Sequence, residues 1–380
     1  MAIRLLALAL ACSASAACST EIAGSPAPKT SVAPIDTGGY NTVPRPVING
    51  SKASQFILAG NFIGERIVSA VDIDPRLRFR TGYNGAMLAP TATLDAQATD
   101  MVVRNGFLYG FRSTSTSGTS EIVTVELWQT TGAEAAQTMT DKLRTYVGGR
   151  NLAPTAKYMI PVRDTTRPEA AQSAIEAVTS VGSIVVYVSA IVDHTSGGRR
   201  VVEQAIDRQV EALQSFTAPD ERTALALAPD RDSIVSYTVR REAAQSNEGY
   251  RDDGYRSGRL QALLEEDTAA TQAAFLRTGT DLAATGMNTV YRTRSEAAAK
   301  ELRDHFFEEI TLKGPILQFR TTVPNVPESA CRTFQTTSAE ITGAACVVSR
   351  GRYVSVVYVN HLEQARQVTA AAYAVLGHAR

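Results

Sequence analysis

The apolar positions of the chain follow two spacings, one typical of amphipathic helices and one typical of strands. Helical spacing predicts helices at 52–70, 133–147, 199–216, 295–310 and 362–376. β-Branched and alternating runs predict strands at 101–111, 121–129, 183–192, 233–241, 286–292, 316–322, 332–336 and 353–360. Strands and helices therefore follow one another along most of the chain after residue 50.

Two short strings recur at matching places in the two halves. The string VVYV at 185–188 precedes the last predicted helix of the first half, and VVYV at 356–359 precedes the last helix of the second. Likewise, EAA opens the earlier helix of each half, at 134–136 and at 296–298. The offsets are 171 and 162 residues, close enough for one duplicated unit with a loop insertion. We therefore predict an α+β fold of two similar tandem units, each an antiparallel sheet with helices on one face.

The first seventeen residues have the layout of a secretory signal peptide. Arg4 is their only charge, and an apolar and small-residue run extends from Leu5 to Ala17. A helix that crosses a bilayer needs about 20 apolar residues, so this run is too short to remain as a span. Cys18 follows it directly, as in a bacterial lipoprotein signal, where the cysteine sulfur receives diacylglycerol before cleavage.

Two alternatives to an acylated Cys18 remain open. Cys12 is a second candidate lipid site, although only a short apolar run precedes it. An ordinary signal peptide cleaved near Ala17 would leave Cys18 as a free thiol, which needs a reason in an exported protein. We favour Cys18, and one or two acyl chains there would anchor the protein by burying CH₂ groups at ~0.8 kcal/mol each.

Composition and chain breaks predict four segments. The stretch from 19 to 50 holds five prolines and four glycines, and its apolar residues have no period, so it is typical of a flexible tether. A Thr-Ala-Pro-Asp break at 217–220 separates the two halves. The predicted segments are a lipoprotein signal peptide at 1–17, Cys18 and a linker at 18–50, an N-terminal α+β domain at 51–220, and a C-terminal α+β domain with a disulfide at 221–380.

The folded region contains two cysteines, Cys331 and Cys346. Two such cysteines favour a disulfide in an oxidising compartment, where closing their loop would stabilise the fold by about 3 kcal/mol. The alternative is a pair of metal ligands. That alternative needs further ligands at close spacing, and the nearest histidine, His361, stands alone, so the disulfide is favoured.

Charge and motif content exclude several classes of function. Lys and Arg total 38 and Asp and Glu total 38, so nothing indicates a nucleic-acid partner. The hydrophobic fraction of 44% is enough to build real cores, and no other segment approaches membrane-spanning length. The four histidines stand apart from one another: His194, His305, His361 and His378. Because no metal-ligand spacing, nucleophile elbow, phosphate loop or dinucleotide motif occurs, we expect no enzyme activity, no metal and no cofactor.

Two charged strings are weak ligand candidates. Asp72 and Asp74 would share one face of an extended segment and could hold a cation or a proton there. The blander interpretation, which we favour, is a polar turn at the end of the first helix. Arg76, Arg78 and Arg80 also alternate, so their face could meet a phosphate or sulfate group, although a solvated edge strand is the commoner role of such residues.

Several of these motifs together resemble one family. They are Cys18-Ser-Thr-x-x-x-Gly24, Gly39-Tyr40-x-Thr42, Asp72-x-Asp74-Pro75, and a cysteine-stapled C-terminal unit with Gly351-Arg352-Tyr353-Val354. The chain is similar over most of residues 18–377 to two-domain envelope lipoproteins of mycobacteria, nocardiae and related actinobacteria. The resemblance implies an acylated Cys18 and a position on the outer face of the cytoplasmic membrane, and it carries over no catalytic residue.

The leading hypothesis is a non-enzymatic envelope lipoprotein that binds a lipid-like or small amphipathic ligand. Helices packed on a sheet can open an apolar cavity between the layers, which suits such a ligand. The alternative is a scaffold or sensor that docks another envelope protein through an exposed sheet or an apolar patch. A hydrolase acting on an envelope substrate ranks third, because it requires titratable groups within mutual reach in a cleft.

Overall fold

The computed structural model describes residues 34–47, 50–90, 96–118, 121–146, 153–155, 157–158, 161–167, 172–193, 195–241, 254–336 and 342–379. The chain from Ile35 to Arg380 forms one compact unit. The predictions for the signal peptide, Cys12, Cys18 and His194 fall outside the described residues. None of the helices in these ranges is both long enough and apolar enough to span a bilayer.

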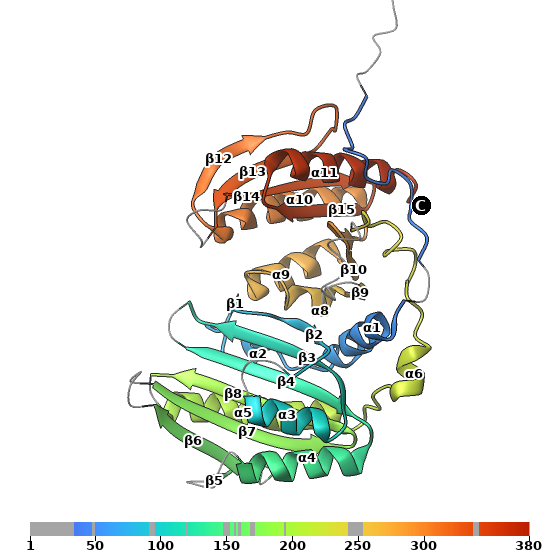
Figure 1. The fold of residues 1–380 in the computed structure, drawn as a ribbon. Coiled ribbons are helices and arrows are strands. Elements are labelled where there is room, and N and C mark those ends of the chain that lie inside the picture. The colour runs from blue at the N-terminus through green and yellow to red at the C-terminus, as the bar shows by residue number, and fades with distance from the viewer. Residues whose placement is uncertain are drawn as a thin grey trace, which may run out of the picture. The chain divides into compact units, whose positions relative to one another are not determined.

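The N-terminal half forms an antiparallel sheet in the order β1-β3-β4-β8-β7-β6-β5, with β2 paired to β3 (Figure 1). Its strands are β1 (Phe79–Arg80), β2 (Gly85–Met87), β3 (Phe107–Thr116), β4 (Ile122–Thr130), β5 (Ala153–Pro154), β6 (Pro161–Arg167), β7 (Gln172–Val181) and β8 (Ile184–Val192). Its helices are α1 (Lys52–Gly64), α2 (Ala70–Ile73), α3 (Ala96–Arg104), α4 (Ala133–Tyr146), α5 (Thr195–Leu213) and α6 (Glu221–Leu225).

The C-terminal half forms a second antiparallel sheet in the order β12-β13-β14-β15-β11-β10-β9. Its strands are β9 (Gly254–Ser257), β10 (Leu282–Thr285), β11 (Thr289–Arg292), β12 (Ile316–Thr321), β13 (Ala330–Gln335), β14 (Thr342–Arg350) and β15 (Tyr353–Val359). Its helices are α8 (Gly258–Ala262), α9 (Thr268–Thr278), α10 (Glu296–Glu309), the 3₁₀ helix η2 (Ile310–Lys313) and α11 (Leu362–Leu376). The chain is therefore α+β with two tandem domains.

The two domains share one topology. In the first, β3 and β4 lead to α4, then to the strands β5 to β8 and finally to α5; in the second, β10 and β11 lead to α10, β12 to β15 and α11. The sheet order β3-β4-β8-β7-β6-β5 matches β10-β11-β15-β14-β13-β12. The recurring VVYV strings lie in the matching strands β8 and β15, and the EAA strings lie in α4 and α10. The repeated sequence strings therefore lie in structurally equivalent elements of the two domains.

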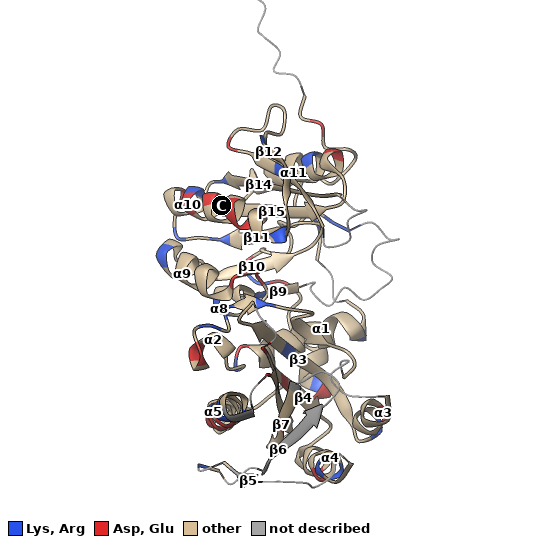
Figure 2. Ribbon diagram, turned by 90° about the vertical axis from the view of Figure 1, so that its left-hand side faces the viewer, with Lys and Arg blue, Asp and Glu red and all other residues tan. Residues whose placement is uncertain are grey.

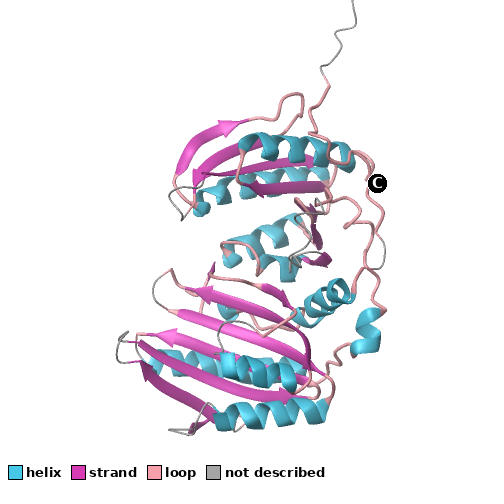
Figure 3. Cartoon of the chain, viewed as in Figure 1, coloured by secondary structure: helices cyan, strands magenta, loops and turns pink. Residues whose placement is uncertain are grey.

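Helices cover both faces of each sheet, whereas one covered face was predicted (Figure 3). In β8, Val186 and Val188 pack in a core with α1 and α5, and Val185 and Tyr187 pack in another core with α3 and α4. In the second domain, α9 and α10 cover one face and α11 covers the other. The continuous apolar run in β8 is typical of a strand buried on both sides, and this is the signal that the one-face prediction overlooked.

The strand predicted at 233–241 is wrong, because this stretch is a run of turns. The Asp230 carboxylate accepts hydrogen bonds from the backbone N–H groups of Val235 and Ser236, at 2.8 and 3.1 Å. Ile234 and Val239 are nevertheless fully buried. The apolar spacing therefore predicted correctly that this segment is buried, but the predicted strand conformation is wrong.

Other predicted boundaries also differ from the structure. The strand predicted at 101–111 begins as α3, and β3 starts at Phe107. The helix predicted at 52–70 ends at Gly64. In contrast, α11 has the predicted bounds and α10 differs from them by one residue at each end.

Two glycines let α1 lie close to its sheet. A Cβ atom on Gly60 would come within 2.6 Å of the Gly110 carbonyl oxygen, and one on Gly64 would come within 2.6 Å of the Phe111 ring. Close approach of this helix face to β3 leaves the opposite face, which carries Leu58, turned toward the second domain.

The segment 35–47, part of the predicted tether, packs on the C-terminal domain. Ile35 and Tyr40 contact the apolar cluster around α11. Gln364 and Gln367 of α11 donate hydrogen bonds to Tyr40 and Asp36, both at 3.1 Å. The chain that leads toward Cys18 therefore departs from α11 of the second domain.

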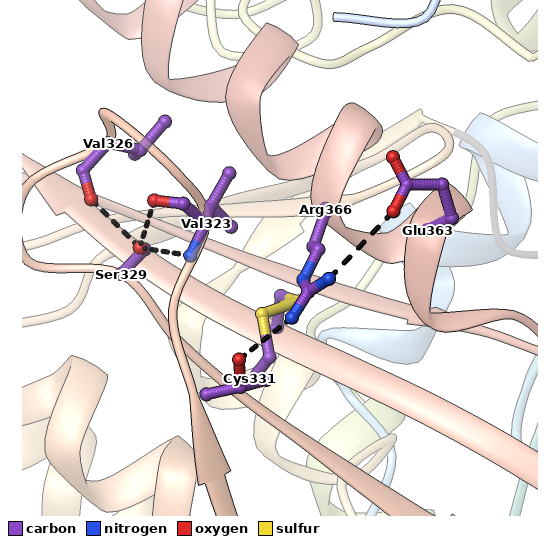
Figure 4. The surroundings of a disulfide bond; sticks show 8 residues. Val323, Val326, Ser329, Cys331, Glu363 and Arg366 are labelled. Carbon is purple, nitrogen blue, oxygen red and sulfur yellow. Dashed lines mark hydrogen bonds and ion pairs between the residues drawn. A yellow bond between two sulfur atoms is a disulfide. The ribbon is translucent and has the colours of Figure 1, made fainter. Parts of the chain in front are cut away.

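The predicted disulfide is present between Cys331 of β13 and Cys346 of β14, and both residues are fully buried (Figure 4). The loop that leads into β13 is closed by Ser329. Its hydroxyl accepts the Val323 N–H at 2.9 Å and donates to the Val326 carbonyl at 2.8 Å. The disulfide thus joins two central strands beneath α11.

Candidate functional site

Asp72 and Asp74 do not share an extended face. Asp72 is an exposed residue of α2, and Asp74 follows the helix as a buried residue. The Arg76 guanidinium holds the Asp74 carboxylate, with Nη2 and Oδ2 2.7 Å apart. Hydrogen bonding to Arg76 lowers the pKa of Asp74 below its usual value. Asp74 and Arg76 therefore form a polar turn, as the blander interpretation predicted, although the turn follows α2 and not the first helix.

Arg78 and Arg80 join the two domains. Arg78 pairs with Asp267, and Arg80 pairs with Glu266. The backbone N–H of Arg80 donates to the Glu266 carbonyl, and that of Thr268 donates to the Arg78 carbonyl, both at 2.9 Å. Each guanidinium group is thus paired with a protein carboxylate, and these arginines serve as a domain joint. Figure 2 shows basic and acidic stretches of the ribbon between α8 and α2, where the two domains meet.

A buried cluster of acids and tyrosines adjoins this joint. Tyr291 and Gln261 both donate to Oε1 of Glu265, at 2.6 Å each. Oε1 of Glu309 accepts the backbone N–H groups of Glu266 and Asp267, at 3.0 and 3.3 Å. We call Glu265, Glu309, Tyr291 and Tyr358, with the backbone of 266–267, the acid cluster.

One carboxyl group of the acid cluster has no partner for its second oxygen. Oε2 of Glu309 is buried and accepts no hydrogen bond from the described residues, and Nε2 of His305 lies 3.6 Å away. Burial, followed by the nearby Glu265, raises the pKa of Glu309 to about 8. Burial also lowers the pKa of His305. The two groups are therefore both neutral at pH 7, and their contact is not an ion pair.

The acid cluster is closed to substrates and metals. Its two glutamates are at most 8% exposed, and Tyr291 is 1% exposed. Across the described ranges, no three His, Cys, Asp or Glu side chains are placed to hold a metal ion. The cluster can store a proton at the joint, but it offers no open cleft.

An open groove runs along the outer face of α1. Three adjoining hollows form it, with volumes of about 320, 280 and 460 Å³. Leu58 lines both the first and the second, whereas Phe62 and Leu227 line both the second and the third. We call this series of hollows the α1 groove. Their size is in the range of small-molecule sites.

Apolar and basic side chains line the α1 groove together. Leu58, Phe62 and Leu227 provide apolar surface, and Phe62 is 46% exposed. Arg231 and Arg240 are exposed at the groove, and neither side chain has a hydrogen bond or ion pair with a described residue. An unpaired guanidinium beside apolar surface suits a ligand with an anionic head and an apolar body.

Two amides on α1 add unused acceptors to the groove. Gln55 lines the first hollow and Asn61 the second. The side-chain oxygens of both are buried and receive no hydrogen bond from the described residues, although the residues are only 4% and 2% exposed. Buried polar atoms without partners are uncommon, so both amides would gain from a hydrogen-bond donor, although neither oxygen is open to the groove surface in this structure.

The sequence contains no local signal for the α1 groove. The first two hollows are lined by the segment at 45–47, α1, the turns at 227–240 and β9. The third is lined by the end of β4 and the turn after it, by Ser183 and by residues 217–223. No motif joins such distant segments; Arg240 lies in the stretch that was predicted to be a strand, and Arg231 lies just before that stretch. The charged residues singled out at 72–80 instead form a polar turn and the joint between the two domains.

Family models match nearly the whole chain. Residues 48–228 match the N-terminal domain of unknown function DUF7373, and residues 234–379 match its C-terminal domain. The chain therefore belongs to the DUF7373 family, whose two domains correspond to the two sheets. No curated protein matches the sequence.

One solved structure resembles part of the chain. It is the extracellular domain of PknH from Mycobacterium tuberculosis, with a TM-score of 0.32 and 11% sequence identity. The similarity covers 40% of this chain and 94% of that domain.

Proposed function

We propose that this chain is an actinobacterial envelope lipoprotein that binds an anionic amphipathic small molecule in the α1 groove. Acylated Cys18 holds it on the outer face of the cytoplasmic membrane. The lipoprotein-like leader supports this location, and so does the disulfide, because disulfides persist outside the reducing cytosol. The protein binds its ligand without converting it.

The observation that carries the proposed ligand is the pairing of free cations with apolar surface. Arg231 has no carboxylate partner among the described residues, and it lines the same hollow as Leu58 and Phe62. A carboxylate or phosphate head would bind the guanidinium, while an acyl or prenyl body would cover the apolar residues. No histidine or cysteine lines the three hollows, which favours binding over chemistry.

Replacing Arg231 and Arg240 should weaken the binding of a fatty-acid probe. We expect Arg231→Gln/Arg240→Gln to raise the Kd of 11-(dansylamino)undecanoic acid roughly tenfold or more, because each arginine contributes a charge-assisted hydrogen bond of about 1.5–3 kcal/mol. Fluorescence titration gives the Kd.

Arg277→Gln is the matched control, since Arg277 is exposed on α9 and lines none of these hollows. The probe's methyl ester should bind the unaltered protein about as weakly as the acid binds the double variant. Equal affinity for acid and ester, or equal loss in all variants, would contradict the proposed site.

Acylation of Cys18 is tested independently of the ligand. Metabolic labelling with an alkyne fatty acid should tag the wild-type protein in an actinobacterial host, and Cys18→Ala should abolish the label, because the thiol is the acyl acceptor. Cys12→Ala should retain it. Label lost in Cys12→Ala and kept in Cys18→Ala would place the lipid on the other cysteine.

A further inference from the structure

Three large apolar side chains are exposed within the stretch of eight residues from 312 to 319, which runs from a 3₁₀ helix into β12. Leu312 lies in η2, and Leu317 and Phe319 lie in β12; they are 48%, 55% and 75% exposed. β12 is the terminal strand of its sheet. We call these three residues the apolar edge. Exposed apolar groups that gather in this way mark a contact surface.

The backbone of β12 is poorly suited to pairing with another strand. Its register against β13 shifts twice, between Ile316 and Gln318 and again between Gln318 and Thr321. Irregular edge strands discourage the addition of a further strand from another chain. The apolar edge can therefore make contacts through its side chains but not through backbone hydrogen bonds. Such a surface suits the apolar interior of a lipid bilayer better than a strand of another protein.

The path of the chain brings this edge near the proposed anchor. Ile35 packs against the cluster that contains Val323 and Val326, which lie in the loop directly after β12. Residues 18–34 connect that point to Cys18. If these residues form the tether that their composition predicts, 17 of them span about 20–25 Å from end to end, and six strand residues span about 20 Å. Cys18 and the whole apolar edge can therefore reach one bilayer surface together.

A cation stands beside the apolar edge. Arg320 follows Phe319, is exposed, and makes no hydrogen bond or ion pair with a described residue. Its guanidinium lies 5.0 Å from the centre of the Phe307 ring. Apolar side chains next to an unpaired arginine suit the boundary between acyl chains and phosphate headgroups.

We propose that the apolar edge inserts into the outer leaflet of the membrane that holds Cys18, and so docks the C-terminal domain on lipid. This contact rests on the proposed lipid anchor. The bilayer is its partner, and Leu317 and Phe319 are the inserted groups. The α1 groove then faces the envelope at a set distance from the surface, instead of swinging freely on its tether.

The experiment anchors the protein chemically, so its result does not depend on acylation in the host. Cys18 is the single free thiol of the chain from residue 18, since Cys331 and Cys346 are disulfide-bonded. Residues 18–380 are coupled through Cys18 to maleimide-lipid vesicles of phosphatidylcholine and phosphatidylglycerol, with or without dibrominated phosphatidylcholine. Phe319→Trp adds a reporter at the edge, and Trp128, which is fully buried, is the only native tryptophan.

Brominated lipid should quench the added fluorescence of Phe319→Trp roughly twofold or more, because inserted side chains lie about 5–10 Å into the interface, within reach of bromine. Leu276→Trp, at an 82% exposed position on α9, is the control and should not be quenched. Equal quenching of the two variants, or none in either, overturns the proposal.

A blue shift of Phe319→Trp that follows protein concentration in the absence of vesicles also overturns it, because it would indicate a second copy as the partner. Loss of fatty-acid labelling at Cys18 in cells with quenching intact would refute the natural anchor alone.

Discussion

Glu309→Gln is expected to remove most of the loss of stability that the wild-type protein undergoes between about pH 4.5 and pH 8. The pKa of the Glu309 carboxyl is raised to about 8 from a reference of 4.5, mainly by burial. The folded protein therefore holds a proton through this interval that the unfolded chain has released. The free energy of unfolding therefore falls as pH rises through this interval, by several kcal/mol in total.

The groups around Glu309 explain the direction of this effect. Glu265 and Glu266 oppose a further negative charge, and Lys313, which is paired with Glu266, offsets them only in part. Tyr291 of β11 is fully buried and Tyr358 of β15 is half-buried. Desolvation raises the pKa of both phenols, so they remain neutral. Backbone N–H groups from 266–267 favour the charged form, but burial outweighs them.

Glutamine reproduces the neutral acid at this position. Its carbonyl oxygen can accept the two backbone N–H groups that Glu309 now binds, and its amide can face His305. Urea unfolding followed by circular dichroism at several pH values gives the comparison. The variant should match the wild type near pH 5 and exceed it by several kcal/mol near pH 8.5. Glu301→Gln, on the exposed face of α10, should leave the wild-type pH dependence in place. Parallel curves for wild type and Glu309→Gln would show that Glu309 is ionised in the folded protein.

The topology was predictable from the sequence where strands are rich in β-branched residues. The VVYV runs of β8 and β15 and the apolar stripe of α11 stand out from their surroundings. β7 and β14 were not predicted, because alanine, serine, threonine and glycine dilute their apolar alternation. β7 and β14 form hairpins with β8 and β15. The sequence therefore indicated the repeat in only one strand of each hairpin.

The candidate sites were less predictable than the fold. Arg78 and Arg80 were identified as basic residues, but their carboxylate partners lie almost 190 positions away, which no local pattern indicates. Glu265 and Glu266 are consecutive acidic residues, a pattern typical of solvated positions, and the sequence does not reveal that the joint covers them. The disulfide was predictable, because the two cysteines of the folded region and the predicted secretory leader together favour it.

Removal of the disulfide should destabilise the C-terminal domain by about 3 kcal/mol, because the crosslinked residues are 15 positions apart and their loop no longer limits the unfolded chain. Cys331→Ala/Cys346→Ala should therefore lower the urea midpoint of this domain by about 1–2 M. Circular dichroism follows the whole chain, whereas fluorescence of Trp128 reports on the N-terminal domain, in whose core it is buried.

Circular dichroism and Trp128 fluorescence together show whether the disulfide stabilises the C-terminal domain alone or both domains. If the joint at Arg78 and Arg80 is the weaker element, the circular dichroism transition shifts and the Trp128 transition does not. A shift of both by the same amount would mean that the joint makes the two domains unfold as one. Thiol titration of the unfolded wild-type protein supplies the control, because a protein that already carries two free thiols at Cys331 and Cys346 has no crosslink to lose. An unchanged midpoint in the double variant of an oxidised protein would contradict the expected effect. A shift would tie the stability of this domain to an oxidising compartment, and hence to export.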